Sequence, residues 1–193
     1  MDTGVYQAGG GTPGAAAEFA PGSDVIYSVH GRCQVKAIEE RTVGGQRLRF
    51  YRLEPQRSAL SRSTRPEPAI WLPVMNANQR GLRCLMNKEQ CQQAFEILTD
   101  GEYYFALQNA WNHTQSELEA CLAIEGGIGL AKVLGFLHVL KARRIVPPSD
   151  VIRMFELVHR LLVRELVEVL GEPVKTIEER VEKALRQKLK PDS

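Results

Sequence analysis

The feature of this 193-residue chain that most limits its fold is a change of pattern near residue 87. Before that point, turn residues separate short β-branched and aromatic runs, which predict strands. These runs are residues 24–27, 33–38, 48–53 and 69–74. After that point, apolar residues such as Cys91, Ala94 and Leu98 recur at spacings of three and four, the pattern of one helix face. The sequence therefore predicts an α+β fold in which a β unit precedes a helical unit.

The β unit is predicted to be a small barrel of the SH3 or Tudor type, because four or five short strands follow one another closely at residues 19–86. Gly44 and Gly45 between two of the runs predict a hairpin, since glycine accepts the positive φ angles of such turns. A polar loop at residues 56–68 precedes the last major strand. Residues 1–18 are rich in Gly and Ala, lack aliphatic periodicity, and are expected to be a flexible leader.

Residues 87–193 are predicted to form a compact all-α domain. Asn87 is a candidate N-cap of the first helix. A long helix is expected to begin near Glu102 and to break at Gly126 and Gly127. The later helices are expected at residues 128–144, 149–170 and 174–189.

Charge is distributed unevenly, although the net charge of the whole chain is only +2. From Arg32 to Arg83 there are eleven basic residues and four acidic ones, whereas residues 101–127 contain four carboxylates and no Lys or Arg. A positive β unit is steered toward an acidic protein surface or a phosphate backbone, and a negative helix repels phosphates. The alternative is that each arginine simply lies on a solvated strand face, where an exposed charge contributes little to stability or binding.

No catalytic constellation has a signature in the sequence, so the protein is predicted to be a non-enzyme with no cofactor, metal or small-molecule substrate. The glycines at residues 9–11 precede neither a strand nor a Lys-Ser/Thr pair, and therefore do not form a phosphate loop. His30 and Cys33 have an H-x-x-C spacing, but no second pair of ligands follows. His138 and His159 fall within apolar helical runs and are expected to be core or boundary residues.

The location is predicted to be cytoplasmic. The longest purely apolar stretches fall far short of the roughly 20 residues that a membrane-spanning helix needs. The N-terminus has no basic start and no continuous apolar segment of the kind found in secretory signals. The four cysteines form no C-x-x-C pair, so reduced and mostly buried thiols are expected.

Several stretches resemble one known family. Residues 19–31 (FAPGSDVIYSVHG), followed by 35–39 and the hairpin at 41–45, are similar to the start of the CarD/CdnL family of bacterial transcription regulators. Residues 72–74, Ala77 and 81–83 resemble the last strands of that opening module. In the helical half, the matches are Trp111, residues 130–133 and residues 162–166, which arrive in the family's order.

The resemblance implies a Tudor-like module that binds the β-subunit lobe of RNA polymerase through an exposed strand edge. By position, Arg41, Thr42 and Val43 would face the polymerase, with Trp71 nearby on the last major strand. The helical domain would lie at the upstream edge of the promoter bubble. There Trp111 would act as a DNA wedge.

The chain departs from the family pattern at three places. Trp71 stands where family members tend to carry a basic residue, and the Arg/Ser/Pro loop before it looks like an insertion. Trp111 leads into an acidic helix, where the family has a basic one. The matched region retains Lys132 and Arg153, and Arg143 and Arg144 could form a separate basic edge. DNA contact is therefore expected to be weak or to depend on the polymerase.

Two interpretations stay open. In the first, the protein regulates promoter open complexes by binding the polymerase β subunit. In the second, it is an adaptor that does not bind DNA, in which the Tudor-like module holds an acidic protein and the helices hold another partner. Trp111 is a wedge in the first interpretation and a core anchor in the second.

Overall fold

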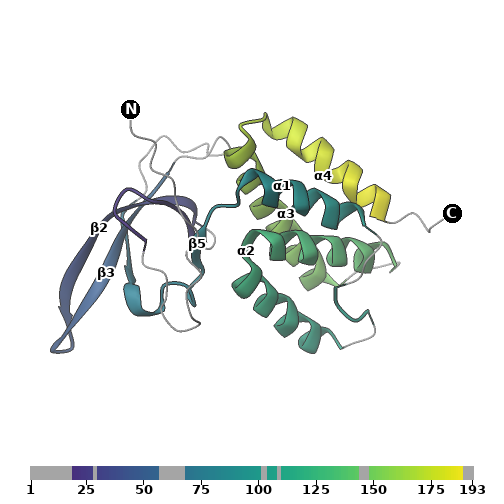
Figure 1. Ribbon diagram of the computed structural model, residues 1–193. Helices are drawn as coiled ribbons and strands as arrows, with labels where there is room; N and C mark the ends of the chain where they lie inside the picture. The colour runs from purple at the N-terminus through teal and green to yellow at the C-terminus, as the bar shows by residue number, and fades with distance from the viewer. Residues whose placement is uncertain are drawn as a thin grey trace.

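Every strand precedes every α-helix along the chain in the computed structural model (Figure 1). The structure describes residues 19–27, 30–56, 68–100, 104–107, 110–143 and 148–188. The predicted leader at residues 1–18 and most of the predicted polar loop at 56–68 lie outside the described residues. The predicted α+β class is confirmed.

The β unit is one antiparallel sheet of five strands in the order β4-β3-β2-β1-β5. The strands are β1 (Asp24–Tyr27), β2 (Gly31–Val43), β3 (Gln46–Pro55), β4 (Ile70–Pro73) and β5 (Leu82–Cys84). A short 3-10 helix, η2 (Val74–Asn76), follows β4. The sheet is open, because β4 and β5 are its two edges and do not pair with each other in the described part of the chain. The predicted closed barrel is therefore not confirmed.

Strands β2 and β3 form a long hairpin that curves away from the helices (Figure 1). Gly44 and Gly45 make its turn with φ angles of 59° and 82°, as the sequence predicted. The pairing register shifts between Val35 and Ala37, which marks a β-bulge. A bulge bends and twists its strand. Beyond it, β3 stays paired with β4 as far as Phe50, and the hairpin then extends past the flanking strands.

One face of the sheet carries the core of the β unit. Val35, Leu53 and Tyr51 are almost completely buried there, together with Leu72 from β4. The Tyr51 hydroxyl accepts a hydrogen bond from the backbone N–H of Phe19 at 3.0 Å, which fixes the start of the described chain to this core. Successive strand residues point to opposite faces, so the neighbouring positions lie on the outer face.

The helical unit consists of α1 (Lys88–Thr99), α2 (Trp111–Ala142), α3 (Ser149–Leu170) and α4 (Val174–Lys188). Asn87 caps α1 as predicted: its side-chain oxygen accepts from the Gln90 N–H at 2.7 Å, and Gln90 accepts from the Asn87 N–H at 3.0 Å. The expected helix start near Glu102 is wrong. Helix α2 begins at Trp111, and the described residues 104–107 before it are not helical.

Gly126 breaks α2 where the sequence predicted an interruption. Its φ of 57° and ψ of −122° are not helical, so the two parts of α2 meet at a sharp kink. The apolar residues of the second part pack with α1, α3 and α4 in one hydrophobic core. By length and composition α2 could also cross a membrane, but 56% of its most apolar window is buried in the protein, as in the core helix of a soluble domain. The cytoplasmic location stays a prediction.

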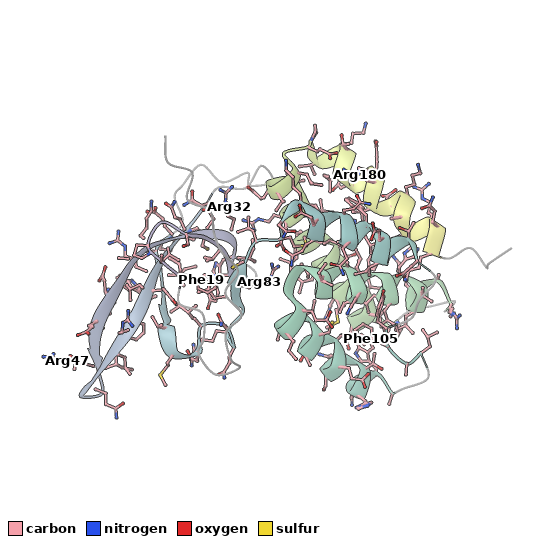
Figure 2. All side chains as sticks on the ribbon, viewed as in Figure 1. Phe19, Arg32, Arg47, Arg83, Phe105 and Arg180 are labelled. Carbon is pink, nitrogen blue, oxygen red and sulfur yellow. The ribbon has the colours of Figure 1, made fainter. Side chains whose placement is uncertain are left out.

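The sheet and the helices meet at a junction built around arginines and glycines (Figure 2). Arg83 of β5 forms a two-fold hydrogen-bonded ion pair with Glu165 of α3, at 2.7 and 2.6 Å. The Glu165 carboxylate also accepts from the Met86 N–H at 2.9 Å. Arg32 of β2 pairs with Glu168 of α3 at 3.1 Å and with Asp24 of β1 at 2.8 Å. These contacts set the position of the helical unit relative to the sheet.

Candidate protein-interaction surface

The outer half of the β2–β3 hairpin is a two-stranded ribbon with free backbone on both sides. Along β2, only residues 31–34 pair with β1. Along β3, only residues 50–53 pair with β4. Within the described part of the chain, residues 36–43 of β2 thus have a strand neighbour on one side only. Such an edge presents unpaired N–H and C=O groups that a strand of another protein can bind.

Arg41 and Trp71, two of the predicted polymerase-binding residues, are brought together by the sheet. The Arg41 Cζ lies 3.2 Å from the centroid of the Trp71 ring. Strand pairing places Trp71 opposite Arg52, and Arg41 opposite Leu48, all on the outer face, away from the buried core. A guanidinium over an indole contributes roughly 0.5–1 kcal/mol at an exposed site. The stack therefore favours this position of the Arg41 side chain over others.

The hairpin end carries the other two predicted residues and further positive charge. Thr42 and Val43 are exposed, and the Val43 side chain, at 53%, is one of the few large apolar residues so exposed in the described chain. Arg47 points away from the helices at the hairpin end (Figure 2). We define the hairpin surface as residues 36–49 with Trp71. It combines a free strand edge, a stacked arginine and an exposed valine.

Trp111, the predicted wedge, is the first residue of α2 and is partly buried against the helical core. Its indole N–H is buried and has no hydrogen-bond partner among the described residues. A buried indole normally finds an acceptor. The structure thus places much of this ring in the helical core rather than on an open face.

The two predicted DNA-contacting cations differ in their surroundings. Lys132 forms an ion pair with Glu125 at 2.5 Å and lies 5.0 Å from the Tyr104 ring centroid, so its charge is largely compensated within the chain. Arg153 is 81% exposed, and its one ion-pair partner among the described residues is Asp150, at 3.9 Å. Lys132 lies in the second part of α2 and Arg153 near the start of α3, whereas Trp111 begins the first part of α2. The structure does not bring the three into one shared cluster of contacts.

The helical histidines are boundary residues that flank one aromatic ring. Phe155 lies 6.1 Å from His138 and 6.0 Å from His159, measured between ring centroids. Burial lowers the pKa of both imidazoles below the ordinary value. The positive charge of Lys141 adds to this effect at His138, whereas at His159 the carboxylates of Glu178 and Glu182 partly oppose it. Both are therefore neutral at pH 7 and add no positive charge for nucleic acid.

The described residues contain no group of three His, Cys, Asp or Glu side chains that could hold a metal ion. Of the four cysteines, Cys33 and Cys91 are buried, Cys121 is partly buried and Cys84 is exposed. Burial, with a smaller contribution from a nearby carboxylate, raises the pKa of both Cys91 and Cys121 to about 11. These two thiols are thus poor nucleophiles at neutral pH.

Sequence reasoning missed the residues that join the two units. Glu165 lies among apolar residues of α3, and Arg83 is one basic residue among many, so neither had a local signature. One signal was available: a glutamate on the apolar stripe of a predicted helix. Such a residue is almost never fully buried without a partner, so its position indicates a buried ion pair.

No protein-family model matches this sequence, and neither does any curated protein.

Proposed function

We propose that this chain is a non-enzymatic transcription regulator of the CarD/CdnL type. Its open sheet corresponds to the family's Tudor-like module and binds the RNA polymerase β-subunit lobe through the hairpin surface. The helical unit then acts on promoter open complexes, and its own contact with DNA is weak or requires the polymerase.

One observation carries the proposal: the free edge of β2 at residues 36–43, next to Arg41 held on Trp71. Strand addition at this edge would supply backbone hydrogen bonds, and the arginine would meet an acidic side chain of the partner. The hairpin points away from the helices, so a partner can reach the edge without disturbing the junction. Trp71 replaces the family's basic residue and orients a cation supplied by Arg41.

The test is capture of the full chain by an immobilised polymerase β lobe. Arg41→Glu is expected to weaken binding at least roughly tenfold, because it reverses a charge at the proposed contact and removes the stack on Trp71. Lys175→Glu makes the same charge change on an 88% exposed side chain of α4 and should leave binding unaltered. Equal capture of wild type and Arg41→Glu would contradict the proposal.

A second candidate is an adaptor that binds a protein but no DNA. It is favoured by one specific observation: Lys132 is already ion-paired, and Trp111 is packed against the helical core. With Lys132 already paired, less positive charge is left at the matched positions to offset desolvation of phosphates.

The lifetime of promoter open complexes, measured with polymerase, separates the two candidates. The regulator predicts that Trp111→Ala shortens the lifetime severalfold. Because that substitution also removes core packing, Arg153→Glu gives an independent readout on a side chain that is 81% exposed. Lifetimes equal to wild type for both variants would favour the adaptor.

A further inference from the structure

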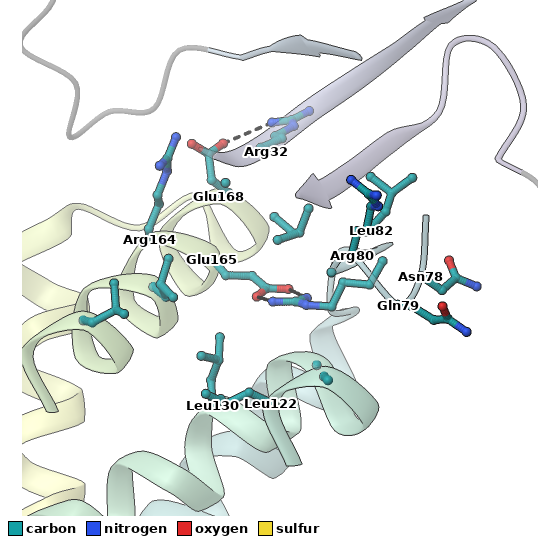
Figure 3. Close-up of a pocket in the computed structure, with 18 residues that line it drawn as sticks. Arg32, Asn78, Gln79, Arg80, Leu82, Leu122, Leu130, Arg164, Glu165 and Glu168 are labelled. Carbon is teal, nitrogen blue, oxygen red and sulfur yellow. Dashed lines mark hydrogen bonds and ion pairs between the residues drawn. The ribbon is translucent and has the colours of Figure 1, made fainter. Parts of the chain in front are cut away.

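A pocket of about 400 Å³ lies between the sheet and the helices (Figure 3). Its walls come from β1, β2, β5, the turn at residues 78–81, α2 and α3. The volume falls in the range of small-molecule sites, about 300–1,000 Å³. Neither unit has this pocket alone, because each contributes part of the wall.

Aliphatic side chains make up the apolar part of the wall. They are Ile26, Leu82, Leu122, Leu130, Leu157 and Leu161. Leu122, Leu157 and Leu161 are only partly buried, so they keep apolar surface that a ligand can cover. Among the residues that the structure describes, no aromatic side chain lines the pocket. The lining therefore suits an aliphatic chain better than a ring that needs a stacking partner.

Four arginines and two glutamates line the same pocket. Arg83 and Arg32 are neutralised by the carboxylates of Glu165 and Glu168. Within the described part of the chain, Arg80 and Arg164 have no ion-pair partner. Figure 3 shows Arg164 on the α3 side and Arg80 on the side of the 78–81 turn. The uncompensated charge of the pocket is positive.

Arg164 is held in place although it lacks a charged partner. Its guanidinium lies so close to Gly31 that a Cβ there would overlap with it. Its Nε is buried and has no hydrogen-bond acceptor among the described residues. A buried, unsatisfied donor is costly, and an arginine binds a carboxylate with two parallel hydrogen bonds.

From these observations we infer that the pocket binds a small aliphatic carboxylate. The carboxylate is held by Arg164 in the positive field to which Arg80 contributes, and the aliphatic chain lies along the leucines. The ligand touches both units and so favours their observed arrangement over any separated one. This site is distinct from the hairpin surface, and it adds a small-molecule ligand to a protein for which the sequence predicted no small-molecule substrate.

Isothermal titration of the full chain with decanoate tests the inference. Decanoate is expected to bind, whereas acetate, which lacks the chain, and 1-decanol, which lacks the charge, should bind at least tenfold more weakly. Arg164→Ala should weaken decanoate binding roughly tenfold or more, because a hydrogen bond to a charged group is lost. Arg160→Ala removes an exposed arginine from the same helix and should leave the affinity unchanged.

Leu122→Trp is a second variant, which keeps every charge and fills the pocket. It should abolish decanoate binding. Its circular dichroism spectrum should stay that of wild type, which shows that the variant is folded. The inference is overturned if decanoate does not bind wild type. It is equally overturned if 1-decanol binds as tightly, or if Arg164→Ala and Leu122→Trp both keep wild-type affinity.

Discussion

Glu165→Leu is expected to lower the free energy of unfolding by about 3–5 kcal/mol, the usual cost of removing one partner from a buried ion pair. The Glu165 side chain is only 2% exposed, and its carboxylate accepts from both terminal nitrogens of Arg83 and from the Met86 N–H. Leucine would leave the guanidinium and the backbone N–H without their acceptor. Urea unfolding followed by circular dichroism measures the change.

Two further variants show whether the effect comes from the buried pair. Arg83→Met combined with Glu165→Leu should recover part of the loss, because no unpaired charge remains at the junction. Glu182→Gln breaks an exposed ion pair with Arg186 on α4 and should change stability by less than about 1 kcal/mol. A loss below about 1 kcal/mol for Glu165→Leu would show that the junction does not depend on this pair.

Lys188→Met is expected to destabilise the protein by about 2–4 kcal/mol, through lost hydrogen bonds to a charged group and an orphaned carboxylate. The Lys188 side chain, at 1% exposure, donates from Nζ to the Ile97 and Asp100 carbonyl oxygens at 3.0 and 2.9 Å. It also pairs with the Asp100 carboxylate at 2.9 Å. The lysine of α4 thus caps the C-terminal end of α1, where a positive charge is favourable.

Lys183→Met is the matched control for this cap. Lys183 lies on the exposed side of the same helix, and its replacement should change stability by no more than about 0.5 kcal/mol. Gly135→Ala probes the same contact from α2, since an added Cβ would lie 3.0 Å from the Lys188 Cε and displace the lysine stem. Thermal unfolding of the three variants, compared at equal protein concentration, measures the effects. Equal midpoints for Lys188→Met and Lys183→Met would contradict the capping role.

Local chemistry explains which elements could be predicted from the sequence. The hairpin turn was predictable because Gly44 and Gly45 accept positive φ angles that other residues resist. The start of α1 was predictable because Asn87 and Gln90 form a capping box within four residues. The kink in α2 was predictable from paired glycines. Each of these features depends on a few neighbouring residues.

Features that depend on distant residues were not predictable. The stack of Arg41 on Trp71 joins residues from β2 and β4, which only the sheet order brings together. The late start of α2 at Trp111 was missed because the aromatic residues at 104 and 105 match a helical pattern but instead pack against the helical core from an irregular segment. Open sheets and closed barrels are both built from short strands of this kind, so the strand pattern in the sequence does not distinguish the two folds.

The glycines at the junction have a consequence for anything that binds the hairpin. Arg164 lies against Gly31, and a Cβ added at Gly126 would lie 2.7 Å from the Arg83 Cδ. The two units therefore approach each other more closely than bulkier residues at these two positions would allow. Only three residues separate β5 from α1. The short connection and the close contacts both favour one arrangement of the two units. We therefore expect a partner bound to the hairpin to determine where the helical unit is presented.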